Sequence, residues 1–394
     1  MPDITVDHFD PLLSDNGPAA VVLKRKLRSI EGEDAWIFPP TFAQSESNED
    51  DENGGGTYQI DELPNDQRRN VCLIDSIGSQ ANRIEPIFKK KPYSELVPQI
   101  RVRLKDQDEV NLLDAGHRAA DAVIRFSKTY GPKLSEAFKT YRENGDCSAL
   151  LSIAPTSLIF GVWDSRATGA KIQRVVRSVM RAYNVTKARR SAIFQPAYDY
   201  TGTEVINPAQ DKGKGTENPL SQEGFKHSPA TNTHGGILAK GGIHQEAVLN
   251  LVALRTLTSD RATRRYLLGL ALVALSYRDQ QGFNLREGCL LCAASEADYN
   301  GHWKVVYFNG KEDADVFEGF NHELALAFAL ETIKENNGGI QIVSPSDADA
   351  FDKETAEKWL ALDKKRRKAL AKMKHPAAAI AAEEAATSKQ KRQT

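Results

Sequence analysis

Residues 70–85 read NVCLIDSIGSQANRIE and contain the first clear structural unit of the chain. The first six residues are almost all apolar, which is typical of a buried strand. Gly78 supplies a flexible turn after them. We expect the segment 76–88 to form that turn and a helix, which ends near Pro86 and the lysines at 89–91. The stretch therefore predicts a buried strand followed directly by a helix.

Three side chains at this turn can donate hydrogen bonds. Gln80 and Asn82 carry amides and Arg83 carries a guanidinium. Donors near the N-terminus of a helix suit phosphate or ribose oxygens. The alternative is structural: Ser79 or Asn82 caps the helix and Arg83 pairs with a neighbouring acid. Local chemistry alone leaves both interpretations open.

Other segments predict a mixture of strands and helices. In 19–30 the period of two places Lys24, Lys26 and Arg28 on one face of a strand. Further strands are expected at 100–104, 157–162, 188–200 (extended), 288–294, 302–308 and 340–343, and helices at 112–127, 131–142, 170–183, 245–257, 263–277 and 321–333. The helix 263–277 is apolar almost all round and should be buried. This order predicts an α+β fold better than a doubly wound parallel sheet.

Two internal segments and the C-terminal region differ from this body, which we expect to extend over 1–351. Residues 44–66 are polar and acidic, with eight acids and no base between 45 and 66, and predict a flexible insertion. Residues 202–244 are rich in Gly, Pro, Ser, Asn and Lys and predict a flexible binding loop. Residues 352–394 predict a basic helix followed by a disordered tail.

Charge is segregated along the chain. Its 394 residues hold 52 Lys and Arg against 53 Asp and Glu, yet residues 166–190 contain eight bases and no acid. On the helix expected at 170–183, Lys171, Arg174, Arg177 and Arg181 would form a row at about 5–6 Å spacing. With Arg166, such a row would neutralise phosphates and give sequence-independent affinity for nucleic acid. The alternative is a solvated helix face.

Recognised catalytic and metal-binding patterns are incomplete. The pair Cys289 and Cys292 has no second pair at a zinc-like spacing. The sequence His322-Glu323 lacks the second histidine of a zincin helix, because Leu326 holds that position. We therefore expect no enzyme, no metal and no cofactor. We expect a cytoplasmic protein without membrane contact. Its four cysteines are too few for a disulfide scaffold, its N-terminus is acidic, and its longest apolar stretch, 266–277, is too short to span a bilayer.

Several motifs together resemble a CRISPR-associated family of the RAMP superfamily. They are DSIGSQANRIE at 75–85, LDAGHRAADAVIR at 113–125, PTSLIFGVWDSR at 155–166 with the basic stretch that follows, and EGFKHSP at 223–229. The family is the backbone subunit of the type I-U (type I-G) Cascade effector complex. The resemblance covers about residues 19–343 and leaves out the acidic stretch near Asn48 and the region after Asp352.

The resemblance implies a fold and a function. Family members have an RRM-like (ferredoxin-like) palm with large inserted finger- and thumb-type segments. Several copies form a helical filament along one guide RNA (crRNA), grip its backbone and present its bases for pairing with target DNA. Guide pairing then carries the sequence specificity. Other Cascade subunits complete the assembly, and a separate recruited helicase-nuclease degrades the target.

We therefore expect a non-catalytic guide-RNA-binding subunit. Its predicted RNA-binding residues are Gln80, Asn82, Arg83, Arg166, Lys171, Arg174, Arg177 and Arg181, with Lys24, Lys26, Arg28 and Lys240 as a second group. One alternative is a metal-independent RAMP-type endoribonuclease that matures the guide, with His117 or His244 as acid or base. Another is a scaffold whose basic segment binds an acidic protein partner.

Overall fold

The computed structural model describes residues 4–43, 57–64, 70–106, 108–213, 217–277, 283–335, 342, 344–371 and 375–393. Its strands are β1 (Ala20–Ser29), β2 (Ile60–Glu62), β3 (Asn70–Asp75), β4 (Arg101–Lys105), β5 (Asp108–Asn111), β6 (Val162–Trp163), β7 (Lys171–Ile172), β8 (Val176–Tyr183), β9 (Val185–Phe194), β10 (Ser228–Ala239), β11 (Ile243–Asn250), β12 (Phe283–Arg286), β13 (Cys289–Ala293), β14 (His302–Val306), β15 (Glu312–Asp313) and β16 (Asp349–Ala350).

The helices accompany a main sheet whose strand pairs are antiparallel, which is typical of an α+β protein. They are α1 (Asp10–Leu13), α2 (Ile77–Ile84), α3 (Ala122–Arg125), α4 (Tyr130–Asn144), α5 (Ser148–Ile153), α6 (Pro155–Phe160), α7 (Pro219–Gln222), α8 (Leu251–Leu257), α9 (Arg261–Ser276), α10 (Glu296–Asn300), α11 (His322–Glu335), α12 (Lys353–Ala361), α13 (Lys364–Ala371) and α14 (Pro376–Gln393). Short 3-10 turns include η1 (Glu85–Lys89), η3 (Leu112–Asp114) and η4 (Arg118–Ala120). The predicted α+β class is thus confirmed.

The main sheet is antiparallel and is built around β1. Among the described residues its order is β12-β13-β1-β11-β8-β3-β2, and β14 pairs with β1 beyond the stretch that β13 covers. In register, Lys26 of β1 lies opposite His244 of β11, which in turn lies opposite Arg181 of β8. Alternate residues of these strands therefore face opposite sides of the sheet.

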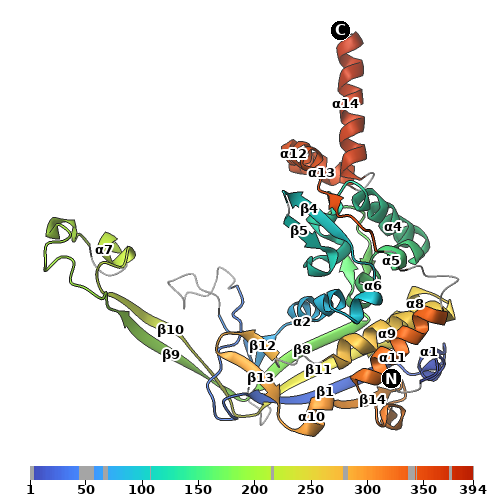
Figure 1. Cartoon of the computed structure of the whole chain (residues 1–394), viewed down its shortest axis with the longest axis horizontal. Coiled ribbons are helices and arrows are strands. Elements are labelled where there is room, and N and C mark those ends of the chain that lie inside the picture. Colours follow the sequence, from blue (N-terminus) through green and yellow to red (C-terminus); the bar gives the residue numbers. More distant parts are fainter. Residues whose placement is uncertain are drawn as a thin grey trace.

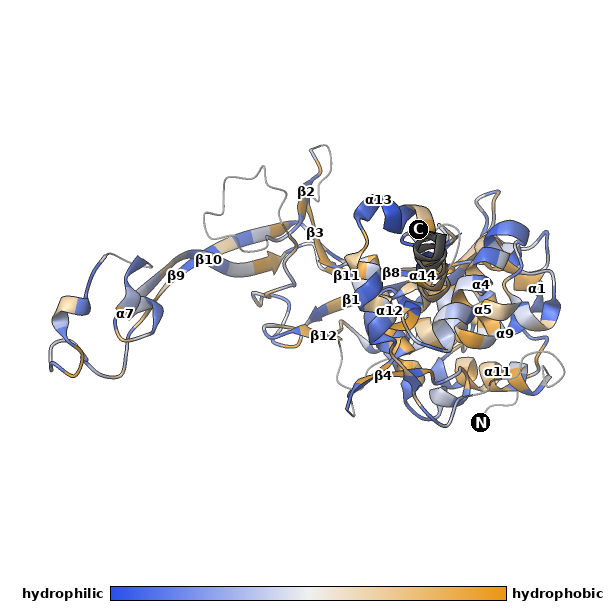
Figure 2. Cartoon of the chain, turned by 90° about the horizontal axis from the view of Figure 1, so that it is seen from above, coloured by the Kyte–Doolittle hydropathy of each residue, from blue (hydrophilic) through white to orange (hydrophobic). Residues whose placement is uncertain are grey.

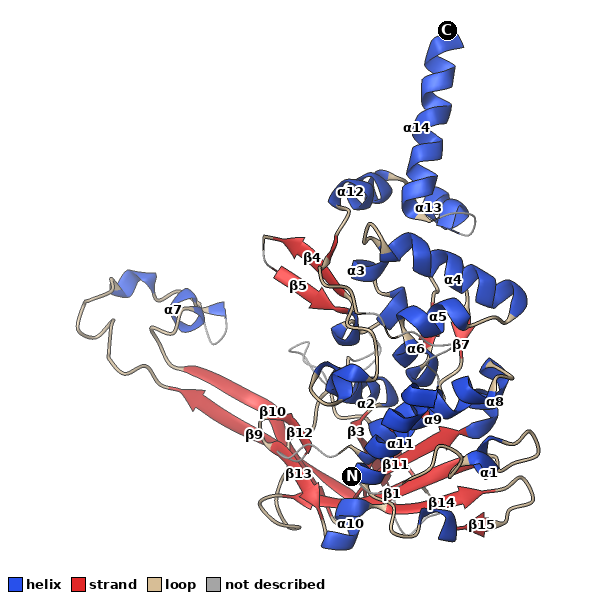
Figure 3. Cartoon of the chain, turned by 45° about the vertical axis from the view of Figure 1, so that its right-hand side comes forward, coloured by secondary structure: helices blue, strands red, loops and turns tan. Residues whose placement is uncertain are grey.

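One side of this sheet is covered and the other is open. Figures 1 and 3 show α2, α9 and α11 on the same side of β1, β11 and β8. The helix α9 is buried over almost its whole length, as its apolar sequence predicts, and Tyr266 at its centre is fully enclosed. We call the opposite, uncovered side of β1, β11 and β8 the outer face.

A long two-stranded arm leaves the body at one end of the sheet. The strands β9 and β10 pair with each other and run outward to a tip that contains α7 (Figure 1). Their pairing register shifts twice, between Ala230 and Thr233 and between His234 and Ile237. The second shift lies where Ile37 bridges Ile237 at the base of the arm. Part of the segment predicted as a flexible loop at 202–244 is therefore a strand.

The predicted helix at 170–183 is wrong: this segment forms β7 and β8. Val176, Ser178, Met180 and Ala182 face the covered side of β8, while Arg177 and Arg181 face outward. Apolar residues at a helical spacing also fit a strand when both of its faces carry apolar groups, as Val179 shows. The valines favour the strand over the helix, because β-branched side chains are more favourable in strands.

Other expected elements also change type. The strand expected at 157–162 is the helix α6, which begins at a proline, and the first half of the helix expected at 245–257 belongs to β11. The helix expected at 112–127 is broken into η3, η4 and α3. Asn111, just before this range, and Asp121, inside it, each cap a new turn, because each side chain accepts a backbone N–H two residues later. The strand expected at 340–343 lies mostly outside the described residues.

The C-terminal region carries three helices where the sequence predicts one helix and a disordered tail. Trp359 of α12 and Ile380 of α14 pack with Phe126 and Ala371 in a small separate apolar cluster. Figure 2 shows α13 as strongly hydrophilic, in keeping with its sequence KKRRKALA. Figure 1 shows α14 projecting away from the body. The predicted acidic insertion at 44–66 falls largely outside the described residues.

Candidate nucleic-acid interface

Residues 75–85 form the predicted strand end and helix, but several of their polar side chains bond to other parts of the protein. Ser76 caps α2 by accepting the N–H of Ser79 at 3.2 Å. Gln80 is only 2% exposed. Its amide donates to Asp75 at 2.6 Å and its amide oxygen accepts from Ser178 at 2.9 Å and Gln245 at 3.2 Å. Gln80 therefore holds α2 to the sheet and lies beyond the reach of a ligand.

These bonds belong to a larger set that we call the buried polar layer. It comprises Arg25, Asp75, Gln80, Ser178 and Gln245, with the Glu85–Arg118 pair beside it. Arg25 donates to Gln245 at 2.8 Å and to the carbonyl of Leu275 at 3.2 Å, which ties β1 to α9. Burying polar groups is tolerated when each finds a partner. The polar side chains on the covered side of the sheet therefore connect the sheet to the helices that pack on it.

Arg83 lies at the edge of this layer. Its Nε is 3.1 Å from Asp75, and its terminal nitrogen donates to the carbonyl of Leu285 at 3.0 Å. This contact is the acid pairing that the sequence left as the alternative for Arg83. Asn82 and Arg83 are both exposed, whereas Gln80 is buried. The three donors predicted at the turn are thus divided between the interior and the surface.

The outer face collects cations from two strands. Lys24 and Lys26 of β1 and Arg177 of β8 are exposed, and Arg28 and Arg181 are partly exposed. The three strands β1, β8 and β11 contain a single acidic residue, Glu246, which pairs with Arg181 at 2.8 Å. Positive charge therefore predominates here, although the predicted helical row of arginines does not exist. Alternation along β8 places Arg177 and Arg181 on this face, whereas Lys171 and Arg174 of the predicted row precede β8.

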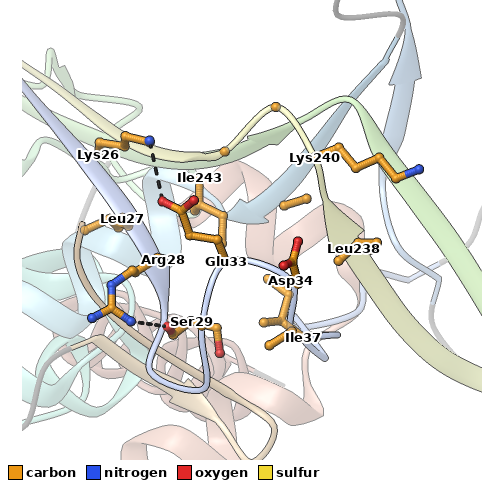
Figure 4. A pocket seen from close by; sticks show the side chains of 15 residues that line it. Lys26, Leu27, Arg28, Ser29, Glu33, Asp34, Ile37, Leu238, Lys240 and Ile243 are labelled. Atoms are coloured by element: carbon orange, nitrogen blue, oxygen red, sulfur yellow. Dashed lines mark hydrogen bonds and ion pairs between the residues drawn. The ribbon is translucent and has the colours of Figure 1, made fainter.

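A pocket of about 290 Å³ lies at one end of the outer face. It brings together Lys26, Arg28 and Lys240, three of the residues predicted from the sequence (Figure 4). Glu33 and Asp34 line it too, and Lys26 Nζ lies 3.7 Å from a carboxylate oxygen of Glu33. Its charges are therefore nearly balanced. This balance makes it a weaker anion site than the open part of the outer face.

A second hollow, with a volume of about 940 Å³, contains another cluster of predicted residues. Three predicted residues, Asn82, Lys171 and Arg174, line it together with His117 and Trp163. Arg174 Nε donates to the carbonyl of Phe160 at 3.0 Å, and burial lowers the pKa of Arg174. We call this hollow the cleft.

A buried ion pair lies behind the cleft. Arg118 Nε is 2.6 Å from Glu85, and both side chains are almost completely buried. Arg118 also donates to Asn82 Oδ1 at 3.2 Å. Burial raises the pKa of Glu85 to about 7, while the charge of Arg118 lowers it. The pair therefore fixes the orientation of Asn82 from behind.

Sequence reasoning missed two residues of the cleft. Trp163 is 61% exposed although its neighbours Val162 and Asp164 are buried. The pattern apolar–Trp–Asp in a strand could have signalled an outward-facing ring. The second residue is Arg118, to which the sequence analysis gave no role. It lines the cleft and forms the buried ion pair with Glu85. Arg166, a predicted residue, is exposed in the turn between β6 and β7.

The residues considered for catalysis lie apart. His117 is exposed at the cleft, whereas His244 lies on the outer face with its ring 5.6 Å from that of Tyr183. His322 contacts Tyr93 at 2.7 Å and Ser276 at 2.9 Å.

Cys289 is buried and its pKa is raised to about 12 by desolvation. Within the described part of the chain no group of three or more His, Cys, Asp or Glu is placed to hold a metal ion.

Comparison with known proteins gives one family match. The family model of the CRISPR-associated protein GSU0053 (Cas_GSU0053) matches residues 21–187, which include β1, β3, α2, the cleft and β8. This range is similar to a CRISPR-associated protein, in line with the resemblance seen in the sequence motifs. No curated protein matches the chain.

Among solved structures, the chain is similar to a chain of a "CRISPR RNA-guided surveillance complex, pre-nicking". The two chains are 13% identical, with a TM-score of 0.30, and the alignment covers 74% of this chain and 79% of the other. Separately, no helix in the described ranges combines the length and apolar character that crossing a membrane requires.

Proposed function

We propose that the chain is a guide-RNA-binding backbone subunit of a Cascade-type CRISPR complex of type I-U (type I-G). The observation that carries the proposal is the outer face, where cations from β1 and β8 surround one acid. A surface of this kind binds the phosphate chain of RNA without reading its sequence. The match of residues 21–187 to a CRISPR-associated family supports the same assignment.

The topology supports an RRM-like palm. The strands β14 or β13, β1, β11 and β8 lie side by side in that order, and each neighbouring pair is antiparallel. The helix α9 follows β11 and covers the sheet. A ferredoxin-like sheet has this strand order, with β3 and β2 added at one edge. In this arrangement the outer face is the open side of the palm.

The arm provides a means of assembly. Exposed apolar side chains gather on the outer half of β9 and in the tip beyond it: Ile193, Phe194, Tyr198, Val205 and Phe225. The rings of Tyr198, Tyr200 and Phe225 lie 5.2–5.5 Å apart in a row. Exposed apolar groups of this extent are typical of a protein interface. We assign the tip to contact with the next copy of the chain along the guide.

The subunit acts by binding. It holds the guide for pairing with target DNA, other subunits complete the complex, and a recruited helicase-nuclease cuts the target. The endoribonuclease alternative has one favourable observation, the exposed His117 in the cleft. Incubating the purified protein with repeat RNA separates the two: intact RNA supports the binding subunit, and defined cleavage products that His117→Ala abolishes support the nuclease.

The central experiment is co-expression with a guide array and the neighbouring components. We expect guide RNA to copurify with the chain, and replacement of Lys24, Lys26 and Arg177 by Ala to reduce the bound RNA strongly. A matched control replaces Lys133, Lys334 and Lys353, three exposed lysines away from the outer face. Equal loss in the two variants, or protein that purifies free of nucleic acid, would contradict the proposal.

A further inference from the structure

The cleft combines features that the outer face lacks. It is formed by four separate segments: α2, the turn before η4, β6, and β7 with the residues after it. Positive charge at its rim comes from Lys171 and Arg174, and a large ring stands beside them in Trp163. Basic groups next to an exposed aromatic ring are the usual combination in sites for single-stranded nucleic acid.

Trp163 is held outward by its own hairpin. The buried Asp164 accepts hydrogen bonds from the backbone and the hydroxyl of Thr168, both at 2.7 Å, and its own N–H donates to Ala170 at 2.9 Å. These bonds close the loop between β6 and β7. The indole therefore stands exposed on fixed backbone, and less ordering entropy opposes binding than for a mobile side chain.

Lys171 adds charge beside this ring. Its ammonium lies 5.6 Å from the centre of the Trp163 ring, across the β6–β7 pair. A cation at this distance is attracted to the ring. It is also in place to meet a phosphate attached to whatever stacks on the indole. The pair thus offers one group for a base and one for its phosphate.

The floor of the cleft supplies a directed donor. Asn82 Oδ1 accepts from the buried Arg118, so its amide nitrogen turns away from that partner. Among the described residues, this nitrogen has no hydrogen-bond acceptor. The floor is also free of bulk at Gly78, where an added Cβ would meet no atom within 4 Å. A planar ligand with a carbonyl oxygen fits this floor.

We propose that the cleft binds one unstacked nucleotide of single-stranded RNA, with its base on Trp163, its phosphate at Lys171 and Arg174, and a base or sugar oxygen at Asn82. The inference rests on the proposed function, because it names a specific nucleotide site within the RNA interface. It adds a position where the protein holds a base rather than the backbone alone.

The test measures the affinity of the full chain for a short, fluorescently labelled oligouridylate by anisotropy, and it follows the intrinsic tryptophan emission of the wild type in parallel. Trp303 and Trp359 are buried and Trp36 is partly exposed, so Trp163 is the most exposed of the four tryptophans. We expect the RNA to quench the wild-type emission, and Trp163→Ala to weaken binding about tenfold, since one base stacked on a ring contributes on this scale. Trp163→Phe should recover much of the affinity. Phe308→Ala, at a ring that is 79% exposed elsewhere, is the matched control.

A second variant keeps the ring and blocks the floor. Gly78→Phe adds a side chain where the structure leaves room, and it should weaken oligouridylate binding with Trp163 still present. Unchanged affinity in both Trp163→Ala and Gly78→Phe, while the wild type binds RNA, overturns the nucleotide site and leaves the proposed function standing. A wild-type chain that binds oligouridylate through Trp163 but copurifies without guide RNA retains the site and removes the guide-binding function. Absence of any RNA binding by the wild type overturns both.

Discussion

The outer face and the buried polar layer occupy opposite sides of the same strands, and both contain charged residues. On the outer face Lys24 and Lys26 lie in solvent, whereas Arg25 between them is buried and hydrogen-bonded to Gln245. The difference teaches that position along the strand, rather than residue type, decides whether a cation is open to solvent or holds the fold together. The two sets should therefore respond differently to substitution.

The sharpest test of the buried set is removal of Arg118. Arg118→Ala leaves the carboxylate of Glu85 without its cation in the interior, which costs about 3–5 kcal/mol of unfolding free energy. Urea denaturation measures the change. Arg101→Ala, which breaks an exposed pair with Glu109, is the control and should cost less than about 1 kcal/mol. Similar losses in the two variants would contradict the distinction between buried and exposed pairs.

Gln80→Ala tests the link between α2 and the sheet. It removes the amide that joins Asp75, Ser178 and Gln245, and it leaves buried polar groups short of a partner. We expect a loss of about 3 kcal/mol by urea denaturation. The salt dependence of RNA binding should stay unchanged. A stable variant with weaker RNA binding would move Gln80 from the buried set to the interface.

Glu85→Gln probes the pH dependence of the same region. Burial raises the pKa of Glu85 from 4.5 to about 7, so the folded chain binds more protons than the unfolded chain in this interval. Stability from this group is fully present below about pH 4.5 and is lost as the pH rises through about 7. The unfolding free energy, measured by urea denaturation at a series of pH values, should depend less on pH in the variant than in the wild type. An identical dependence in the two proteins would contradict the raised pKa of Glu85.

Replacement of Lys24, Lys26 and Arg177 by Ala should have the smallest effect on folding. These side chains are exposed, so each change should alter the unfolding free energy by no more than about 0.5 kcal/mol. The slope of log affinity for single-stranded RNA against log salt should fall by about 2, at about 0.7 for each phosphate contact. An unchanged slope would separate the outer face from RNA binding.

The sequence allowed the strands at 19–30 and 70–75, the helix that follows the second strand and the buried helix at 263–277 to be predicted, although Gly78 lies inside its helix and not in a turn before it. Each has one clear signal: alternation, an apolar run, or apolar residues all round a helix. The segment 170–183 has two competing signals. Its apolar spacing fits a helix, but Val179 packs on the face opposite to Val176, so only the sheet shows which period applies.

The candidate site was predicted in part. Alternation placed Lys24, Lys26 and Arg28 together, and the charge block identified Lys171 and Arg174. Neither signal could show that Gln80 is buried, since this depends on Ser178 and Gln245 of two distant strands. The cleft depends on four segments that only the fold brings together. The local pattern around Trp163 could have indicated an exposed ring, but not the cleft that the ring borders.

The two register shifts in the β9–β10 arm have a mechanical consequence. Ten residues of strand give the arm a length of about 30 Å. Each shift disrupts the ladder and bends the ribbon locally, and the second lies at its base. A rotation of about five degrees there would sweep the tip through about 3 Å over that length. Small changes in angle at the base of the arm therefore become large displacements at its tip, while the body keeps its structure.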